Sequence, residues 1–123
     1  MSPSIHAHPV NAAAVSAVSD AVISMSDAEA LGRLLALLSD PVRVRVLFAL
    51  VETEELCVGD IALVLGISMD QSSYALKLLR SSGLVQSRRD GRVIYYRLAD
   101  EFPHQLLEHC MKQLLDISMK KAR

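Results

Sequence analysis

A thiol and a carboxylate stand three residues apart in the stretch ELCVGD, where Cys57 is one of two cysteines in the chain. At this spacing on a helical turn, Cys57 and Asp60 share one face and can reach a common ligand. Near the N-terminus, HAH adds the imidazoles of His6 and His8. Two imidazoles, a thiolate and a carboxylate can complete a tetrahedral zinc site. The alternative is that these histidines are only solvated and that Cys57 is a small apolar side chain at a helix start.

A second group of possible ligands lies near the C-terminus, around HQLLEHC. His104 and Glu108 are four residues apart and therefore neighbours on a helix. Together with Asp100 and His109 they form an alternative, non-standard metal site. The simpler interpretation is a histidine–glutamate pair on the surface, beside an apolar stripe that belongs to a dimer interface and consists of Leu107, Cys110, Met111 and Leu114.

Length and composition indicate one globular domain of 123 residues, of which 51% are hydrophobic. We expect a mobile N-terminal arm over residues 1–20, one DNA-binding and dimerisation domain over 21–119 and a short C-terminal tail over 120–123. No apolar run is long enough for a membrane span and no secretory signal is evident, so we expect a cytoplasmic protein. Two cysteines so far apart favour reduced thiols over a disulfide framework.

Capping signals predict most of the helices. SDAE, from Ser26, fits a capping box and predicts a first helix that ends near residue 39. VRVRV alternates like a strand, but Asp40 followed by Pro41 favours a helix over 41–52. A short helix in CVGDIALVLG is closed by Gly66, and the next opens at Ser68 and continues to 82.

A predicted β-hairpin and a last helix indicate the fold class. LVQSRR and RVIYYRL flank Asp90 and Gly91, the dipeptide typical of a tight β-hairpin. A last helix is expected over 103–119. The sequence therefore predicts a mainly α protein with a small β-hairpin (α+β), a winged helix-turn-helix with additional dimerisation helices at both ends.

The second helix of the predicted helix-turn-helix has two faces. Leu76 and Leu79 face the core, and Ser72 also points inward. Hydroxyl, phenol and amine groups lie on the opposite face, where they suit base edges and phosphates of the DNA major groove. The alternative is a solvated face with no ligand. The predicted DNA contacts of this helix and its start are Ser68, Asp70, Gln71, Ser73, Tyr74 and Lys77.

Positive charge is concentrated around this helix and the hairpin. Residues 71–97 hold six basic residues and one acid, a local charge of +5 in a chain whose total is −1. Nucleic-acid binding depends on such a local face rather than on net charge. Arg88, Arg89 and Arg92 flank the hairpin tip and are predicted to reach the DNA backbone or minor groove.

The stretches LSDPVRVRVLFAL, ELCVGDIALVLGIS and LKLLRSSGLVQSRRDGRVIYYRLAD resemble the ArsR/SmtB family of repressors over about residues 30–116. The resemblance implies a homodimer that occupies an operator until an inducer releases it. Ser72, Ser73 and Tyr74 stand where the family usually has valine, serine and histidine. The tyrosine therefore suggests an altered operator preference.

The resemblance also bears on the inducer. Gly59 replaces the second thiol of the paired-cysteine motif, which weakens an arsenic or cadmium thiolate site. On the last helix, Phe102 stands where the family has a histidine ligand. In the zinc-responsive branch, the turn supplies a cysteine and an aspartate, matching Cys57 and Asp60, while the arm supplies cysteine or histidine. The match of His6 and His8 to that arm is by residue type alone.

The sequence therefore predicts a dimeric repressor that binds double-stranded operator DNA and is released by a transition-metal ion such as zinc. One alternative is a redox-responsive repressor that uses Cys57 and Cys110. Another is an interaction module that has lost DNA binding. An enzyme is not expected, because the sequence shows no nucleophile–base pair, no phosphate-binding glycine loop and no paired catalytic carboxylates.

Overall fold

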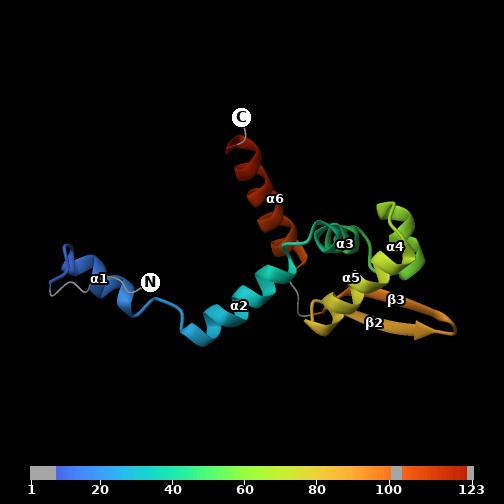
Figure 1. Ribbon diagram of the computed structural model, residues 1–123, viewed down its shortest axis with the longest axis horizontal. Helices are drawn as coiled ribbons and strands as arrows, with labels where there is room; N and C mark the ends of the chain where they lie inside the picture. The colour runs from blue at the N-terminus through green and yellow to red at the C-terminus, as the bar shows by residue number, and fades with distance from the viewer. Residues whose placement is uncertain (1–7, 101–103, 122–123) are drawn as a thin grey trace. The chain divides into compact units, whose positions relative to one another are not determined.

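The computed structural model describes residues 8–100 and 104–121, and it divides into two units, Met1–Arg33 and Leu34–Arg123. Within the first unit, helix α1 spans Ala12–Ser19 and is exposed along its whole length (Figure 1). The Asn11 side chain accepts a hydrogen bond from the backbone amide of Ala14, which caps the helix. Helix α1 was not predicted from the sequence, because its alanines and valines show no apolar stripe.

Helix α2 spans Met25–Leu37 and begins slightly earlier than predicted. The Ser24 hydroxyl accepts a hydrogen bond from the amide of Asp27 at 3.1 Å, so Ser24 caps this helix. The predicted capping box at Ser26 is therefore wrong. Ser24 and Ser26 each have an acidic residue three positions later, so the sequence alone did not decide which serine caps the helix.

Helix α3 spans Pro41–Glu52, as predicted, with the Asp40 side chain accepting a hydrogen bond from the amide of Arg43. The arginines that imitate a strand pattern have local structural partners. Arg43 Nε donates to the Leu37 carbonyl at 2.6 Å, and Arg45 donates to the Leu65 carbonyl at 3.0 Å. Because both carbonyls lie at helix C-termini, these side chains satisfy acceptors that the helices leave open.

The predicted helix-turn-helix is present. Helix α4 spans Val58–Leu65 and ends at Gly66, whose φ of 66° is left-handed and therefore favours glycine. Helix α5 spans Met69–Ser81 and opens with the predicted capping box between Ser68 and Gln71. The core formed by α3, α4, α5 and the hairpin consists mainly of aliphatic side chains, among them Val46, Leu47, Leu50, Ile61, Leu76, Leu79 and Leu98.

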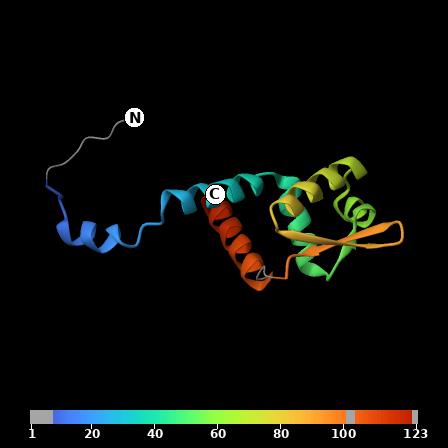
Figure 2. The same cartoon turned by 90° about the horizontal axis from the view of Figure 1, so that it is seen from below.

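A three-stranded antiparallel sheet in the order β1-β3-β2 packs on these helices. Strands β2 (Val85–Asp90) and β3 (Val93–Leu98) form the predicted hairpin, drawn as arrows in Figure 2. Strand β1, Leu56–Cys57, was not predicted; it pairs Leu56 with Tyr96 and Cys57 with Tyr95. The structure thus confirms the mainly helical fold with a small antiparallel sheet.

The final helix, α6, spans His104–Lys121, a little longer than predicted. Its apolar residues Leu114, Leu115, Ile117 and Met119 are exposed. Within the described part of the chain, no helix combines the length and apolarity that crossing a membrane requires.

Ser72 provides a test of how α5 is held. Its hydroxyl is fully buried and donates to the Val58 carbonyl at 3.0 Å, joining α5 to the first residue of α4. We expect Ser72→Ala to lower the free energy of unfolding by about 1 kcal/mol, the net worth of a buried hydrogen bond. Urea denaturation at a fixed protein concentration measures the change.

Ser73→Ala is the matched control, since Ser73 is the exposed neighbour on the same helix. This substitution should change stability by less than about 0.5 kcal/mol. Equal losses in the two variants would contradict the role assigned to the Ser72 hydrogen bond.

Candidate nucleic-acid interface

Helix α5 separates a buried side from an exposed side, as the sequence predicted. Ser72, Ala75, Leu76 and Leu79 are buried. Asp70, Ser73, Tyr74 and Lys77 are exposed, and Tyr74 keeps 62% of its surface accessible. Since the inner residues are fixed in the core, the polar side of the helix can turn only outward.

The exposed side of α5 borders a hollow of about 520 Å³. Its lining combines two cationic side chains, two serine hydroxyls and a tyrosine, and the lining residues are Ser73, Lys77, Arg80, Ser81 and Tyr96. Cations and hydroxyls in one concave surface suit phosphate oxygens. Arg80 was not among the predicted contacts, although its position three residues after Lys77 places both on one side of the helix.

Two of the predicted contacts, Ser68 and Gln71, use their side chains to cap α5. The Ser68 hydroxyl accepts from the Gln71 amide, and Gln71 Oε1 accepts from the Ser68 amide, both at 3.0 Å. These contacts fix the start of the helix. The predicted DNA contact of these two side chains stays a prediction.

The three arginines of the hairpin have different surroundings. Arg89 and Arg92 are exposed beside the turn, where Gly91 has a left-handed φ of 64°. Arg88 lies farther from the tip, opposite Tyr95 in the strand register. Arg89 and Arg92 therefore present their charge beside the turn, whereas the Arg88 side chain, although 52% exposed, lies over the sheet.

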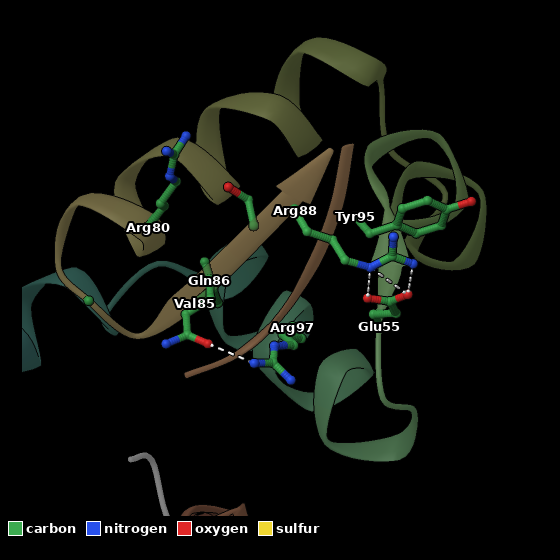
Figure 3. A pocket seen from close by; sticks show the side chains of 9 residues that line it. Glu55, Arg80, Val85, Gln86, Arg88, Tyr95 and Arg97 are labelled. Carbon is green, nitrogen blue, oxygen red and sulfur yellow. Dashed lines mark hydrogen bonds and ion pairs between the residues drawn. The ribbon is translucent and has the colours of Figure 1, made fainter. Parts of the chain in front are cut away.

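Arg88 forms a two-pronged ion pair with Glu55, visible as dashed lines in Figure 3. Arg88 Nε donates to Glu55 Oε2 at 2.9 Å, and Nη2 donates to Oε1. The hydrogen bond from Arg88 holds the pKa of the Glu55 carboxyl below its ordinary value of 4.5. Glu55 thus stays ionised at neutral pH. This pair was not predicted from the sequence, because its members are 33 residues apart.

The candidate ligands at the turn lie at the start of α4. Cys57 is partly buried at the N-cap position, and Asp60 is exposed in the first turn. His8 is exposed and belongs to the first unit, while His6 lies outside the described residues. Among the residues that the structure describes, no three His, Cys, Asp or Glu side chains come together as a metal site.

The alternative ligands near the C-terminus are described in part. Asp100 is paired with Arg97, Oδ1 lying 2.9 Å from Nη2. His109 is exposed and its ring nitrogen lies 3.3 Å from the side-chain nitrogen of Gln113. The side chains of His104 and Glu108 lie outside the described part. The same holds for those of the predicted interface residues Leu107, Cys110 and Met111, whereas Leu114 is 67% exposed.

A family model described as "Bacterial regulatory protein, arsR family" matches residues 40–87. The SmtB transcriptional repressor homologue of Synechocystis sp. is 42% identical over 64% of this chain and 59% of its own length. A CadC cadmium resistance regulatory protein homologue of Staphylococcus aureus is 39% identical over 58% of this chain and 59% of its own. The chain thus spans under two thirds of these two relatives. The SmtB repressor of Mycobacterium tuberculosis is 34% identical over 77% of this chain and 70% of its own.

Two solved structures are similar to this chain in fold. The crystal structure of Rv0081 from M. tuberculosis has a TM-score of 0.69 and 28% identity, covering 81% of this chain and all of that one. A homodimeric winged helix-turn-helix DNA-binding domain from Mycobacterium bovis, a possible ArsR-family regulator, has a TM-score of 0.63 and 28% identity. That match covers 84% of this chain and 95% of the other.

The curated relatives above are named as transcriptional regulators, which supports the prediction that this chain is not an enzyme. The winged helix-turn-helix fold and the family resemblance are confirmed as well. With its helix-turn-helix, its wing and a 34% identical relative aligned over more than two thirds of both chains, this protein belongs to the ArsR family of bacterial regulatory proteins.

Proposed function

We propose that this protein is a homodimeric transcriptional repressor that binds operator DNA and is released from it by a transition-metal ion, zinc. The observation that carries the DNA part is the exposed side of α5 beside a hollow lined by Lys77, Arg80 and two serine hydroxyls. A single α-helix fits the major groove, and the outward side chains of α5 are those that can contact bases.

The wing adds contacts beside those of α5. Arg89 and Arg92 are exposed at the end of the hairpin. A guanidinium group there can pair with backbone phosphates or enter the minor groove. Bases would then be read by Tyr74 and Ser73, with phosphates held by Lys77.

Exposed apolar residues on α2 and α6 support the homodimer. Leu31 and Leu35 on α2 are 48% and 58% exposed, and Leu114 on α6 is 67% exposed. Apolar side chains gathered on one helix favour burial against a partner. The related M. bovis domain is homodimeric. In the proposed dimer, Leu107, Cys110, Met111 and Leu114 lie at the interface.

Zinc is proposed as the inducer because of the donors at the start of α4. Cys57 and Asp60 supply a thiolate and a carboxylate one helical turn apart, and His6 and His8 would complete a tetrahedral set. Thiolate sulfur, imidazole nitrogen and carboxylate oxygen are each donors that zinc accepts in a tetrahedral site. One relative is named for cadmium resistance, which supports a metal response in the family.

The turn that carries Cys57 is joined to the DNA-binding helix by a hydrogen bond. Cys57 is followed by Val58, whose carbonyl accepts the hydrogen bond of Ser72 in the DNA-binding helix. Ligation at Cys57 therefore acts one residue away from a direct contact to α5. An inducer changes DNA affinity only by binding the released state more tightly than the DNA-competent state.

The role of Lys77 can be tested by salt dependence. If Lys77 contacts a phosphate, Lys77→Ala should weaken operator binding and reduce the slope of log K against log salt by about one. The measurement is a salt titration by fluorescence anisotropy with an operator selected from random duplexes. Lys120→Ala, on α6, is the control and should keep the full slope. An unchanged slope in Lys77→Ala would exclude this contact.

If the protein is a homodimer with α6 at its interface, a charge introduced on α6 should prevent assembly. Leu114→Glu should give monomers in sedimentation experiments, because it places a charge in an apolar interface, and these monomers should bind operator weakly. Asp116→Ala, on the other side of the helix, should remain dimeric. Two recognition helices in a dimer lie roughly 34 Å apart, one turn of DNA. A stable monomeric variant with full operator affinity would contradict the proposed assembly.

The zinc site predicts that Cys57→Ser loses most of its zinc affinity, since serine replaces the strongest donor. Deleting residues 1–10 should remove much of the affinity, because His6 and His8 are lost. Both variants should still bind operator but no longer respond to zinc. A chelator competition assay gives the affinity, and zinc binding should release a proton from the thiol.

Glu54→Gln, which changes an exposed carboxylate outside the proposed donor set, is the control for this experiment and should respond to zinc like the unmodified protein. Should the Cys57→Ser and arm-deleted proteins both bind zinc normally and release DNA, the site at the turn is wrong. Asp100, His104, Glu108 and His109 would then be the next group to substitute.

A further inference from the structure

Arg88 occupies a different environment from the two arginines at the hairpin tip. Arg88 pairs with Tyr95 on β3, and the side chains of paired residues lie on the same face of a sheet. The neighbours of Tyr95 in the alternate positions, Tyr96 and Leu98, are buried in the core, so Arg88 and Tyr95 lie on the outer face. There it lines an open hollow of about 530 Å³ together with Glu55, Tyr95 and Arg97 (Figure 3). Arg88 thus faces neighbouring strands of its own sheet.

Three parts of the sheet meet at the Arg88 guanidinium. Glu55, which directly precedes β1, receives both prongs of the ion pair. The guanidinium carbon lies 4.5 Å from the centre of the Tyr95 ring on β3, within the range of a cation–π contact. Arg88 itself belongs to β2. The contacts therefore link all three strands across the face that α5 does not cover.

The electrostatics of this cluster argue against Arg88 as a phosphate ligand. Its charge is already balanced by a carboxylate whose pKa is lowered by the same hydrogen bonds. To bind a phosphate through Nε and Nη2, Arg88 would have to leave Glu55, and its Nη1 already lies 4.0 Å from Asp90 Oδ2. Arg89 and Arg92 are exposed and require no such rearrangement.

We propose that Arg88 is a positioning residue, which fixes the wing to the turn before β1 through Glu55 and Tyr95, and that it does not contact DNA. This inference rests on the proposed DNA binding and refines it: the wing contacts DNA with Arg89 and Arg92, at an angle set by the Arg88 cluster. The cluster also holds the wing beside Cys57, whose backbone pairs with Tyr95.

The proposal is tested by whether one substitution strengthens or weakens operator binding. Glu55→Gln removes a negative charge near DNA and would free Arg88, so a direct phosphate contact predicts tighter operator binding. A positioning role predicts weaker binding, by about fivefold, which corresponds to the loss of one well-formed exposed ion pair. Glu54→Gln is the matched control, since Glu54 is the exposed neighbour and carries the same charge. It should not weaken binding.

A double-mutant cycle completes the test. Arg88→Gln should weaken binding about as much as Glu55→Gln, and the double variant should be no weaker than either single one. The salt slope should stay that of the unmodified protein, whereas Arg89→Gln should lower it by about one. Tighter binding by Glu55→Gln, or a lower slope in Arg88→Gln, would overturn the proposal.

Hydrogen exchange separates this inference from the proposed function. Without DNA, Glu55→Gln and Arg88→Gln should accelerate exchange of the β1 and β3 amides equally, and Glu54→Gln should not. If the unmodified protein binds no DNA, but these amides respond as expected, the DNA-binding proposal fails and the structural link is retained. If exchange is unchanged in both variants, the link itself is wrong.

Discussion

The burial of one side of α5 is the constraint on which the other features depend. Leu76 and Leu79 are fully buried against side chains of α3 and α4. Rotating the helix by one residue would move about 100° of its surface and expose these leucines, at a cost of roughly 2 kcal/mol for each. The core therefore decides which side chains face outward. Ser72 adds a directional hydrogen bond to this packing, which aliphatic contacts alone do not provide.

Features encoded within a few residues were predictable from the sequence. Asp40 before Pro41, the Ser68–Gln71 capping box, Gly66 and the Asp90–Gly91 turn each specify a local conformation, and each occurs where the pattern placed it. Features that depend on distant partners were not. Strand β1 is two residues long, and its pairing with β3 carries no signal of its own. Likewise, nothing near Glu55 indicates an ion pair with Arg88. In the candidate site, the outward face of α5 was predictable, but the different surroundings of the hairpin arginines were not.

The arginines also show why local charge overstates the charge available to a ligand. Arg88 and Arg97 are paired with Glu55 and Asp100, which lie outside the basic segment. Both side chains stay partly exposed, at 52% and 41%, but each already shares its charge with an acid. A positive segment in a sequence therefore sets an upper limit on the charge that a polyanion would meet. The acids that reduce it are identified only when the strands are in register.

The register of β1 has a consequence for how the chain folds. Leu56 pairs with Tyr96, 40 positions later, whereas α4, the turn and α5 are contiguous in the chain. Contacts that close a long loop form later than local ones, because chain entropy must be lost before they contribute. During synthesis, the helix-turn-helix can dock before the second hairpin strand has left the ribosome. Ser72 can hold Val58 as soon as α4 and α5 dock, but the backbone of Cys57 gains its strand pairing only when β3 arrives, so the segment that bears the candidate ligand reaches its final geometry after the helices.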